Sequence, residues 1–356
     1  MEEKKYRVIG VMSGTSLDGI DLVLVEFEKH QYWHFNMLHA ETIPYKTDWQ
    51  ETLKKLVFYS PETLHDIDKT YTNYLAETIS NFIKKHNITH LDAVCSHGHT
   101  ALHQPEKQIT YQIGNLPVLA QLLNGKVVCD FRIQDVKLGG QGAPLVPIGD
   151  ELLFYNYDFC LNLGGFANIS TRVNGERIAY DICPVNIILN HYVKHKGLHY
   201  DDEGKIASTG TLNKKLLNAL NALTFYAENH PKSLGLEWVN ETVLPIIDAY
   251  NLKTEDILRT FVEHIAIQLA SEINKKRNAS VLITGGGVYN AFLIACLQQK
   301  TNNNIIIPSN DLVEFKEALI FGFLGVLKLR DENNCLKSVT GASKDHSSGK
   351  IFLLEK

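Results

Sequence analysis

Several features that mark common classes of protein are missing from this sequence. It contains no long run of lysine and arginine, and its formal net charge at pH 7 is -5. We therefore expect a small-molecule partner and no nucleic acid. The apolar run near the N-terminus is too short for a membrane span or a signal segment, which predicts a cytoplasmic protein without membrane contact. A homodimer is left open.

Metal and nucleotide motifs of the familiar kinds are also absent. There are six cysteines but no Cys-x-x-Cys pair, no His-Glu-x-x-His string, no P-loop and no protein-kinase signature. The cysteines are interpreted as free thiols in a reducing compartment. His97, His99 and His103 form a tight cluster, for which a loop or substrate role outweighs a metal role.

The chain has 356 residues, of which 44% are hydrophobic and 21% are charged. This length favours two domains, and a cleft between two domains is a natural ligand site. Residues 7–26 form two apolar runs around a polar, glycine-containing turn, which predicts a hairpin. Residues 159–173 repeat this plan, so we expect a duplicated architecture with one phosphate loop in each domain.

Strands and helices follow from the remaining patterns. Apolar spacing predicts helices over 60–87, 186–194 and 256–274. Short strands are expected at 91–95, 177–180 and 280–283, and a further apolar stretch covers 126–131. The strand at 91–95 should end at polar residues 96–100, and polar groups at such strand ends commonly face a ligand. The chain is therefore predicted to be an α/β protein.

Phosphoryl transfer requires amide donors around the phosphates, a metal ion and a base. Gly14, Thr15 and Ser16 could wrap the γ-phosphate of ATP, and Asp18 or Asp21 could hold Mg²⁺. The alternative for this segment is an ordinary polar β-turn.

Two further glycine-rich turns complete the candidate nucleotide site. The proposed second phosphate loop comprises Gly164, Gly165 and Asn168. The proposed adenosine site comprises Gly285, Gly286, Gly287 and Asn290 at a strand-to-helix turn, where unpaired N–H groups favour anions. Each turn alone is a weak signal, and their value lies in occurring together.

Asp181 is the candidate general base. It follows the short strand predicted at 177–180 and precedes a proline-stiffened loop, which could hold it rigidly. The alternative, that Asp181 caps the helix predicted at 186–194, carries about equal weight.

Together these motifs resemble those of the anhydro-N-acetylmuramic acid kinases, a branch of the superfamily of sugar kinases and actin. The matching strings are Val-Met-Ser-Gly-Thr-Ser-Leu-Asp-Gly-Ile-Asp, Ser-His-Gly-His-Thr, Gln112-Ile-Gly, Gly-Ala-Pro-Leu-Val-Pro, Asn-Leu-Gly-Gly-Phe-Ala-Asn-Ile-Ser, Thr-Gly-Gly-Gly and Glu317-Ala318. They extend over nearly the whole chain, and the first and fifth are quite specific.

The resemblance implies a two-domain, actin-like sugar-kinase ATPase fold of the ribonuclease H-like type, with an interdomain cleft. The expected domains are residues 1–134 and 135–356, with the tail at about 335–356 packing back on the first. ATP would be bound by Gly14, Thr15, Ser16, Leu17, Asp18, Gly19, Ile20 and Asp21.

The resemblance also implies the reaction. Water activated by Asp181 would attack the anomeric carbon of 1,6-anhydro-N-acetylmuramic acid, and the released O6 would take the γ-phosphate of ATP. The product would be N-acetylmuramic acid 6-phosphate, an intermediate of peptidoglycan (cell-wall) recycling. His97, Gly98, Thr100 and Glu317 would lie in or near the sugar site.

The chain departs from the family pattern in two places. Cys183 and Val185 stand where the family usually has glycine, and His99 stands where glutamine is usual. Losing glycine excludes most positive-φ conformations and adds bulk near Asp181. Two alternatives therefore stay open: a plain hydroxyl kinase for a related amino sugar, and an inactive ATP-binding sensor.

Overall fold

The computed structural model describes residues 4–14 and 17–354. The chain forms two compact units, of which unit 1 contains residues 1–154 and 315–356 and unit 2 contains residues 155–314. Each unit is built on its own β-sheet with helices, which confirms the predicted α/β class. The division into folding domains at residue 134 stays a prediction.

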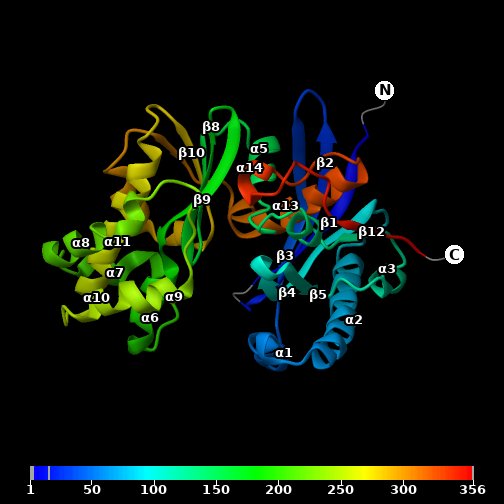
Figure 1. Ribbon diagram of the computed structural model, residues 1–356, viewed down its shortest axis with the longest axis horizontal. Helices are drawn as coiled ribbons and strands as arrows, with labels where there is room; N and C mark the ends of the chain where they lie inside the picture. Colours follow the sequence, from blue (N-terminus) through cyan, green and yellow to red (C-terminus); the bar gives the residue numbers. More distant parts are fainter. Residues whose placement is uncertain (1–3, 15–16, 355–356) are drawn as a thin grey trace. The chain divides into compact units, whose positions relative to one another are not determined.

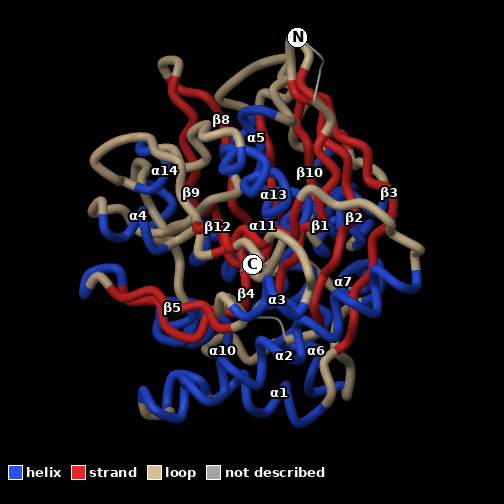
Figure 2. The backbone as a smooth tube through the Cα atoms, turned by 90° about the vertical axis from the view of Figure 1, so that its right-hand side faces the viewer, coloured by secondary structure: helices blue, strands red, loops and turns tan. Residues whose placement is uncertain are grey.

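Unit 1 contains a mixed sheet in the order β12-β6-β4-β1-β2-β3, with β5 paired to β4. Its strands are β1 Tyr6–Ser13, β2 Gly19–Lys29, β3 Trp33–Pro44, β4 Ala93–Gln104, β5 Ile109–Ile113, β6 Val127–Cys129 and β12 Lys350–Phe352. β1, β2 and β3 form an antiparallel meander, visible side by side in Figure 2. β4 then pairs parallel with β1, and β6 pairs parallel with β4.

Unit 1 also contains helices, several of which share a hydrophobic core with this sheet. They are α1 Thr47–Lys54, α2 Pro61–Lys85, α3 Val118–Leu122, α4 Ile133–Lys137, α5 Pro147–Leu152, α14 Lys337–Thr340 and the part of α13 Asn310–Leu329 from residue 315 onward. The predicted helix at 60–87 is confirmed as α2, the long helix beside α3 in Figure 1. Ser60 caps α2 by accepting a hydrogen bond from the N–H of Thr63 at 3.3 Å.

Unit 2 repeats the plan of unit 1 with the strand order β11-β10-β7-β8-β9. Its strands are β7 Phe159–Leu163, β8 Phe166–Val173, β9 Glu176–Pro184, β10 Ser280–Thr284 and β11 Asn304–Ile306. Again three strands, β7, β8 and β9, form an antiparallel meander. β10 then pairs parallel with β7, and β11 pairs parallel with β10. The predicted duplication is therefore confirmed at the level of sheet topology.

The helices of unit 2 pack around a core that includes β7, β9 and β10. They are α6 Asn186–Val193, α7 Lys205–Thr209, α8 Lys214–Asn221, α9 Leu236–Trp238, α10 Leu244–Asp248, α11 Thr254–Ile273 and α12 Ala291–Gln298. The helices predicted at 186–194 and 256–274 are confirmed as α6 and α11. Within the described parts of both units, no helix is long and apolar enough to cross a bilayer.

Two predicted strand ends were wrong. β4 does not stop at Cys95 but continues to Gln104, because β5 pairs antiparallel with its second half, for example His99 with Ile113. β9 does not stop at Tyr180 but continues to Pro184, because β8 pairs with it as far as that residue. In both cases the extension consists of polar or mixed residues whose hydrogen bonds come from a neighbouring strand.

Close packing joins β1 to α13 within unit 1. A methyl group placed on Gly10 would lie 2.0 Å from the carbonyl oxygen of Ala318 and 3.0 Å from the nitrogen of Gly322. Both obstacles are backbone atoms, which cannot rotate away as a side chain could. Only glycine at this position allows the helix to lie this close to the strand.

We predict that Gly10→Ala destabilises the protein by at least about 2 kcal/mol, because the helix or the strand must move to accommodate the methyl group. Differential scanning calorimetry should show a fall in Tm of roughly 5 °C or more. Gly125→Ala is the matched control, since its nearest obstacle lies 3.6 Å away. Equal melting temperatures for the two variants would contradict the role of Gly10.

Candidate active site

The turn between β1 and β2 contains the first group of predicted nucleotide-binding residues. Thr15 and Ser16 lie outside the described residues. The N–H of Leu17 donates to the carbonyl oxygen of Gly14 at 3.4 Å, and Leu17 has a φ of 60°. The antiparallel pairing of β1 with β2 confirms the predicted hairpin.

The start of β2 follows directly. Asp18 is exposed and Asp21 is half-buried, where its Oδ1 accepts a hydrogen bond from the hydroxyl of Thr42 at 2.6 Å. Gly19 is buried against the backbone of Ile43, 2.5 Å from where a methyl group would lie. The side chain of Ile20 is in the hydrophobic core, so only its backbone is available to a ligand.

A buried chain of hydrogen bonds lies beneath this turn. The Oγ of Ser13 is 2.7 Å from the Nδ1 of His99 and 2.5 Å from the hydroxyl of Tyr45, which is 2.5 Å from that of Tyr71. Burial lowers the pKa of His99 to about 4 and raises that of Tyr71 to about 12. At neutral pH these four side chains are uncharged, so their hydrogen bonds fix the base of the turn without adding a charge.

His97 and Gly98 of β4 form a second polar group in unit 1. The Nδ1 of His97 is 2.8 Å from the carbonyl oxygen of Gly98, and its Nε2 accepts a hydrogen bond from the Nε of Arg132 at 2.9 Å. Because arginine only donates, His97 is held as the neutral tautomer with its proton on Nδ1. Burial and the charge of Arg132 keep the pKa of His97 well below its usual range.

The predicted sugar-site residues thus have different surroundings. Gly98 has a φ of 72°, and a methyl group there would lie 2.5 Å from the carbonyl oxygen of Ile113, so glycine is required. Thr100 is half-buried on β4, and Glu317 is exposed on α13 with its charge close to that of Arg132. The three histidines do not form a metal-binding group among the described residues.

Arg132 lies beside the predicted sugar-site residue His97, and the sequence analysis did not single it out. Besides its hydrogen bond to His97, its NH1 donates to the carbonyl oxygen of Gly142 at 2.7 Å. It follows closely after β6, at the end of the sheet where β4 carries His97. The rule that identified His97, polar residues after a buried strand, would also have identified Arg132.

In unit 2, the β7–β8 turn and the triple-glycine turn lie together. β7 and β10 pair parallel, so the residues that follow them leave the sheet at the same edge. A methyl group on Gly285 would lie 2.5 Å from Oδ1 of Asn162, and one on Gly287 would lie 2.7 Å from Cβ of Leu163. Gly286, in contrast, has nothing within 4 Å of a methyl position, so its backbone is open to a ligand.

The structure places the two predicted asparagines outside these turns. Asn290 is the N-cap of α12, where its Oδ1 accepts a hydrogen bond from the N–H of Leu293 at 2.9 Å. The glycines begin the short 3₁₀ helix Gly286–Tyr289, with Gly285 at its N-cap, and this turn precedes α12, so the glycines begin a helical turn as predicted but not α12 itself. Asn168 is exposed on β8, directly opposite Asp181 in the register of the sheet.

Asp181 is held inside β9. Its Oδ2 accepts a hydrogen bond from the N–H of Leu234 at 2.8 Å, and its own N–H donates to the carbonyl oxygen of Lys232 at 3.1 Å. Burial raises the pKa of Asp181 above its ordinary value, and the Leu234 bond opposes that rise in part. The alternative role as a helix cap is wrong, because α6 has Val185 at its N-cap and no side-chain cap.

The two residues that replace family glycines are buried. Cys183 and Val185 are both 0% exposed and belong to the hydrophobic core of unit 2. Val185 has a φ of -129°, and Cys183 is not among the residues with positive φ. With its ψ of -97°, however, the backbone of Val185 lies outside both the α and the β regions that residues with a side chain favour. All six cysteines are free thiols, as predicted, and all six are buried.

His99 should make stability depend on pH. Its pKa is about 4 in the folded protein against an ordinary 6.5, so the unfolded chain binds the extra proton first and stability is lost as pH falls from 6.5 to 4. This loss amounts to roughly 3 kcal/mol for one histidine. His99→Gln, which can still hydrogen-bond Ser13, should show a correspondingly smaller loss.

Urea unfolding at several pH values across that interval measures the difference. His34→Gln, at an exposed histidine of the same unit, is the control and should keep the wild-type pH dependence. If His99→Gln lost stability as steeply as the wild type, His99 would not be the group that takes up the proton.

Comparisons with known proteins agree along the whole chain. The family model described as anhydro-N-acetylmuramic acid kinase matches residues 6–354. The enzyme of that name from Haemophilus influenzae is 31% identical, covering 98% of this chain and 98% of its own. The one from Pasteurella multocida is 33% identical, covering 100% and 99%.

Solved structures were also compared. The ligand-bound xylulose kinase from Lactobacillus acidophilus superimposes with a TM-score of 0.48 at 11% identity, covering 98% of this chain and 94% of its own. The family match over nearly all described residues, together with full-length relatives above 30% identity, decides the relationship. The chain belongs to the anhydro-N-acetylmuramic acid kinase family.

Proposed function

We propose that this chain is an ATP- and Mg²⁺-dependent kinase that hydrolyses the anhydro ring of 1,6-anhydro-N-acetylmuramic acid and phosphorylates O6. The products would be N-acetylmuramic acid 6-phosphate and ADP, and the reaction would serve peptidoglycan recycling in the cytoplasm. The full-length match to the family carries this proposal. The surroundings of Asp181 support its role as the base in this reaction.

Asp181 would act as the general base. Leu234 holds its Oδ2, which leaves Oδ1 to accept a proton from water. The water oxygen would bond to the anomeric carbon as the bond from that carbon to O6 breaks. O6 would then bond to the γ-phosphorus, whose bond to the bridging oxygen breaks so that ADP leaves. The raised pKa of Asp181 increases its strength as a base.

The glycine-rich turns would bind ATP, which supplies the phosphoryl group. Gly286 leaves its backbone open in unit 2, and Gly164 and Gly165 have no atom closer than 3.5 Å to a methyl position. Such bare backbone accepts a phosphate or a flat ring without a steric clash. In unit 1, the turn from Gly14 to Asp21 would contribute further donors to the phosphates.

Mg²⁺ would offset the charge of the phosphates. Asp18 and Asp21 fit this ion, since it is commonly bound through one or two carboxylates, with water and phosphate oxygens completing its coordination. Asp18 is exposed and thus accessible. Asp21 shares its Oδ1 with Thr42, which orients the carboxylate.

Gly98, Thr100 and Glu317 would bind the sugar, with His97 beside them, and we add Arg132 to this group. Both ring nitrogens of His97 are already engaged, one with Gly98 and the other with Arg132. We therefore assign His97 to the orientation of Arg132. Arg132 and Glu317 offer one positive and one negative group to the sugar's carboxylate and hydroxyls.

The substrate specificity can be tested with a coupled ADP-release assay. We expect turnover with 1,6-anhydro-N-acetylmuramic acid and none with N-acetylmuramic acid or N-acetylglucosamine. In ¹⁸O-labelled water, the label should appear at the anomeric carbon of the product. Phosphorylation without this label would exclude ring opening by water, and ATP binding without any turnover would exclude the kinase.

The role of Asp181 predicts that Asp181→Asn lowers turnover by about two to four powers of ten. The asparagine oxygen can still accept from Leu234, so the fold and the ATP affinity should be retained. Steady-state kinetics and ATP titration measure the two effects. Asp202→Asn, at an exposed aspartate of the same unit, is the control. Near wild-type turnover of Asp181→Asn would remove Asp181 from its role.

A further inference from the structure

Outside the candidate active site, a buried cluster in unit 1 combines a thiol, an imidazole and a carboxylate. Cys335 and His346 form an antiparallel β-bridge, in which the N–H of each donates to the carbonyl oxygen of the other, at 3.1 and 3.2 Å. Two residues that exchange both hydrogen bonds in this way lie directly opposite each other. The chain between them contains α14 and returns as a loop.

Asp135 of α4 completes the cluster. One ligand atom from each of Asp135, Cys335 and His346 lies within 4.8 Å of the other two. The three residues are 0%, 2% and 4% exposed, respectively. Asp135 is held on both sides, because its Oδ1 accepts from the hydroxyl of Thr340 and its Oδ2 accepts from the N–H of Gly142, each at 2.7 Å.

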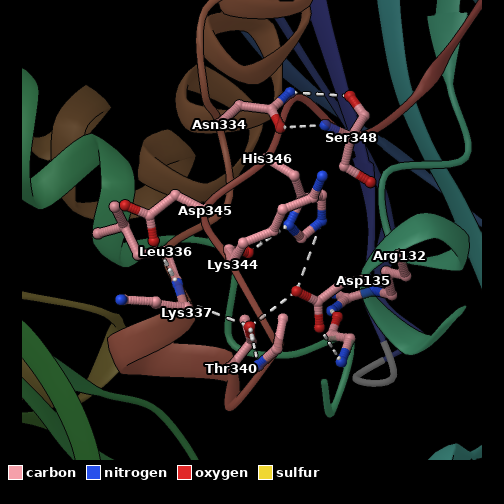
Figure 3. Close-up of polar contacts among 12 residues, drawn as sticks. Arg132, Asp135, Asn334, Leu336, Lys337, Thr340, Lys344, Asp345, His346 and Ser348 are labelled. Atoms are coloured by element: carbon pink, nitrogen blue, oxygen red, sulfur yellow. Dashed lines mark hydrogen bonds and ion pairs between the residues drawn. The ribbon is translucent and has the colours of Figure 1, made fainter. Parts of the chain in front are cut away.

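His346 has a nitrogen that points into this cluster without a hydrogen bond. Its Nδ1 lies 3.1 Å from the carbonyl oxygen of Lys344, which requires the proton of the neutral ring to sit on Nδ1. Its Nε2 then carries a lone pair, is buried, and has no hydrogen-bond partner among the described residues. Figure 3 shows this nitrogen facing Asp135, whose Oδ1 is 3.6 Å away.

We propose that Asp135, Cys335 and His346 bind one Zn²⁺ ion, which fastens the C-terminal segment to α4. Sulfur, imidazole nitrogen and carboxylate oxygen are the donors that Zn²⁺ prefers, with bonds of about 2.0–2.3 Å. Such bonds place the ligand atoms roughly 3.3–3.8 Å apart, close to the 3.6 Å between His346 and Asp135. A water molecule would take the fourth tetrahedral position.

The surroundings match a metal-ligating histidine. In zinc sites the second ring nitrogen of the histidine usually donates to a carbonyl oxygen or a carboxylate, as Nδ1 does to Lys344. Thr340 and Gly142 orient the carboxylate in the same way. The charges also balance, because a thiolate and a carboxylate neutralise a divalent cation in this buried place.

Two nearby features make the binding of Zn²⁺ less favourable. Burial and the charge of Asp135 raise the pKa of the Cys335 thiol to about 12, so Zn²⁺ has to displace its proton. Arg132 places one positive charge near Asp135 and Cys335. Its guanidinium is directed to His97 and Gly142 by hydrogen bonds, and so it is not a ligand of the cluster.

The competing explanation is a proton in place of the metal. A protonated His346 would form an ion pair with Asp135 and would satisfy Nε2 without any ligand. Cys335 distinguishes the two cases. Its sulfur has no part in an imidazolium–carboxylate pair, whereas a metal ion bonds to it directly.

The full-length protein, purified without chelators after growth with added zinc, should contain about one zinc per chain by mass spectrometry. Cys335→Ser and His346→Gln should each retain less than about a tenth of that amount. The control is Cys296→Ser, at a buried cysteine of unit 2, which should keep the zinc. Replacing zinc with Co²⁺ should give a thiolate-to-cobalt absorption band that disappears only in Cys335→Ser among the two cysteine variants.

The wild-type protein alone provides a test that does not depend on folded variants. Removing the metal with a chelator should lower the Tm, and adding Zn²⁺ back should restore it. Wild-type protein with no stoichiometric zinc and no cobalt–thiolate band would overturn the proposal in favour of the ion pair. Zinc retained by the folded Cys335→Ser and His346→Gln variants would overturn it in favour of another site.

Discussion

The parallel pairing of each meander's first strand with a later strand is the constraint on which the candidate site depends. In unit 2, β7 pairs with β10, and this brings the β7–β8 turn next to the triple-glycine turn. In unit 1, β1 pairs with β4, and this brings Ser13 next to His99. Because parallel strands end at the same edge, residues more than eighty positions apart meet without any direct signal in the sequence.

Close backbone packing accompanies this pairing in both units. Gly10 lets α13 lie against β1, and Gly285 and Gly287 let the triple-glycine turn lie against Leu163. The glycines of this sequence therefore have two different structural roles. Some give up a side chain so that two protein backbones can touch, and others, such as Gly286, leave a surface open for a ligand.

Arg132 connects the two proposals made for unit 1. It is oriented by its hydrogen bond to His97 and lies close to the charge of Glu317. It also precedes Asp135 by three residues, so α4 would link the sugar-binding group to the zinc site. A metal that fastens the C-terminal segment to α4 would thereby steady the residues around Arg132.

By itself, the sequence determined the elements with strong local periodicity or turn chemistry. The two hairpins, α2, α6 and α11 follow from apolar spacing and from glycine, proline and serine at their ends. It also determined the family, because Ser-Gly-Thr-Ser-Leu-Asp and Asn-Leu-Gly-Gly-Phe are specific strings. Tertiary structure decided where β4 and β9 end, since pairing with β5 and β8, the strands next to them in the sequence, carries them past the predicted apolar stretches. It also decided that Cys183 and Val185 are core residues and that Cys335 and His346 face Asp135, because such contacts depend on how the chain folds back, which local pattern does not encode.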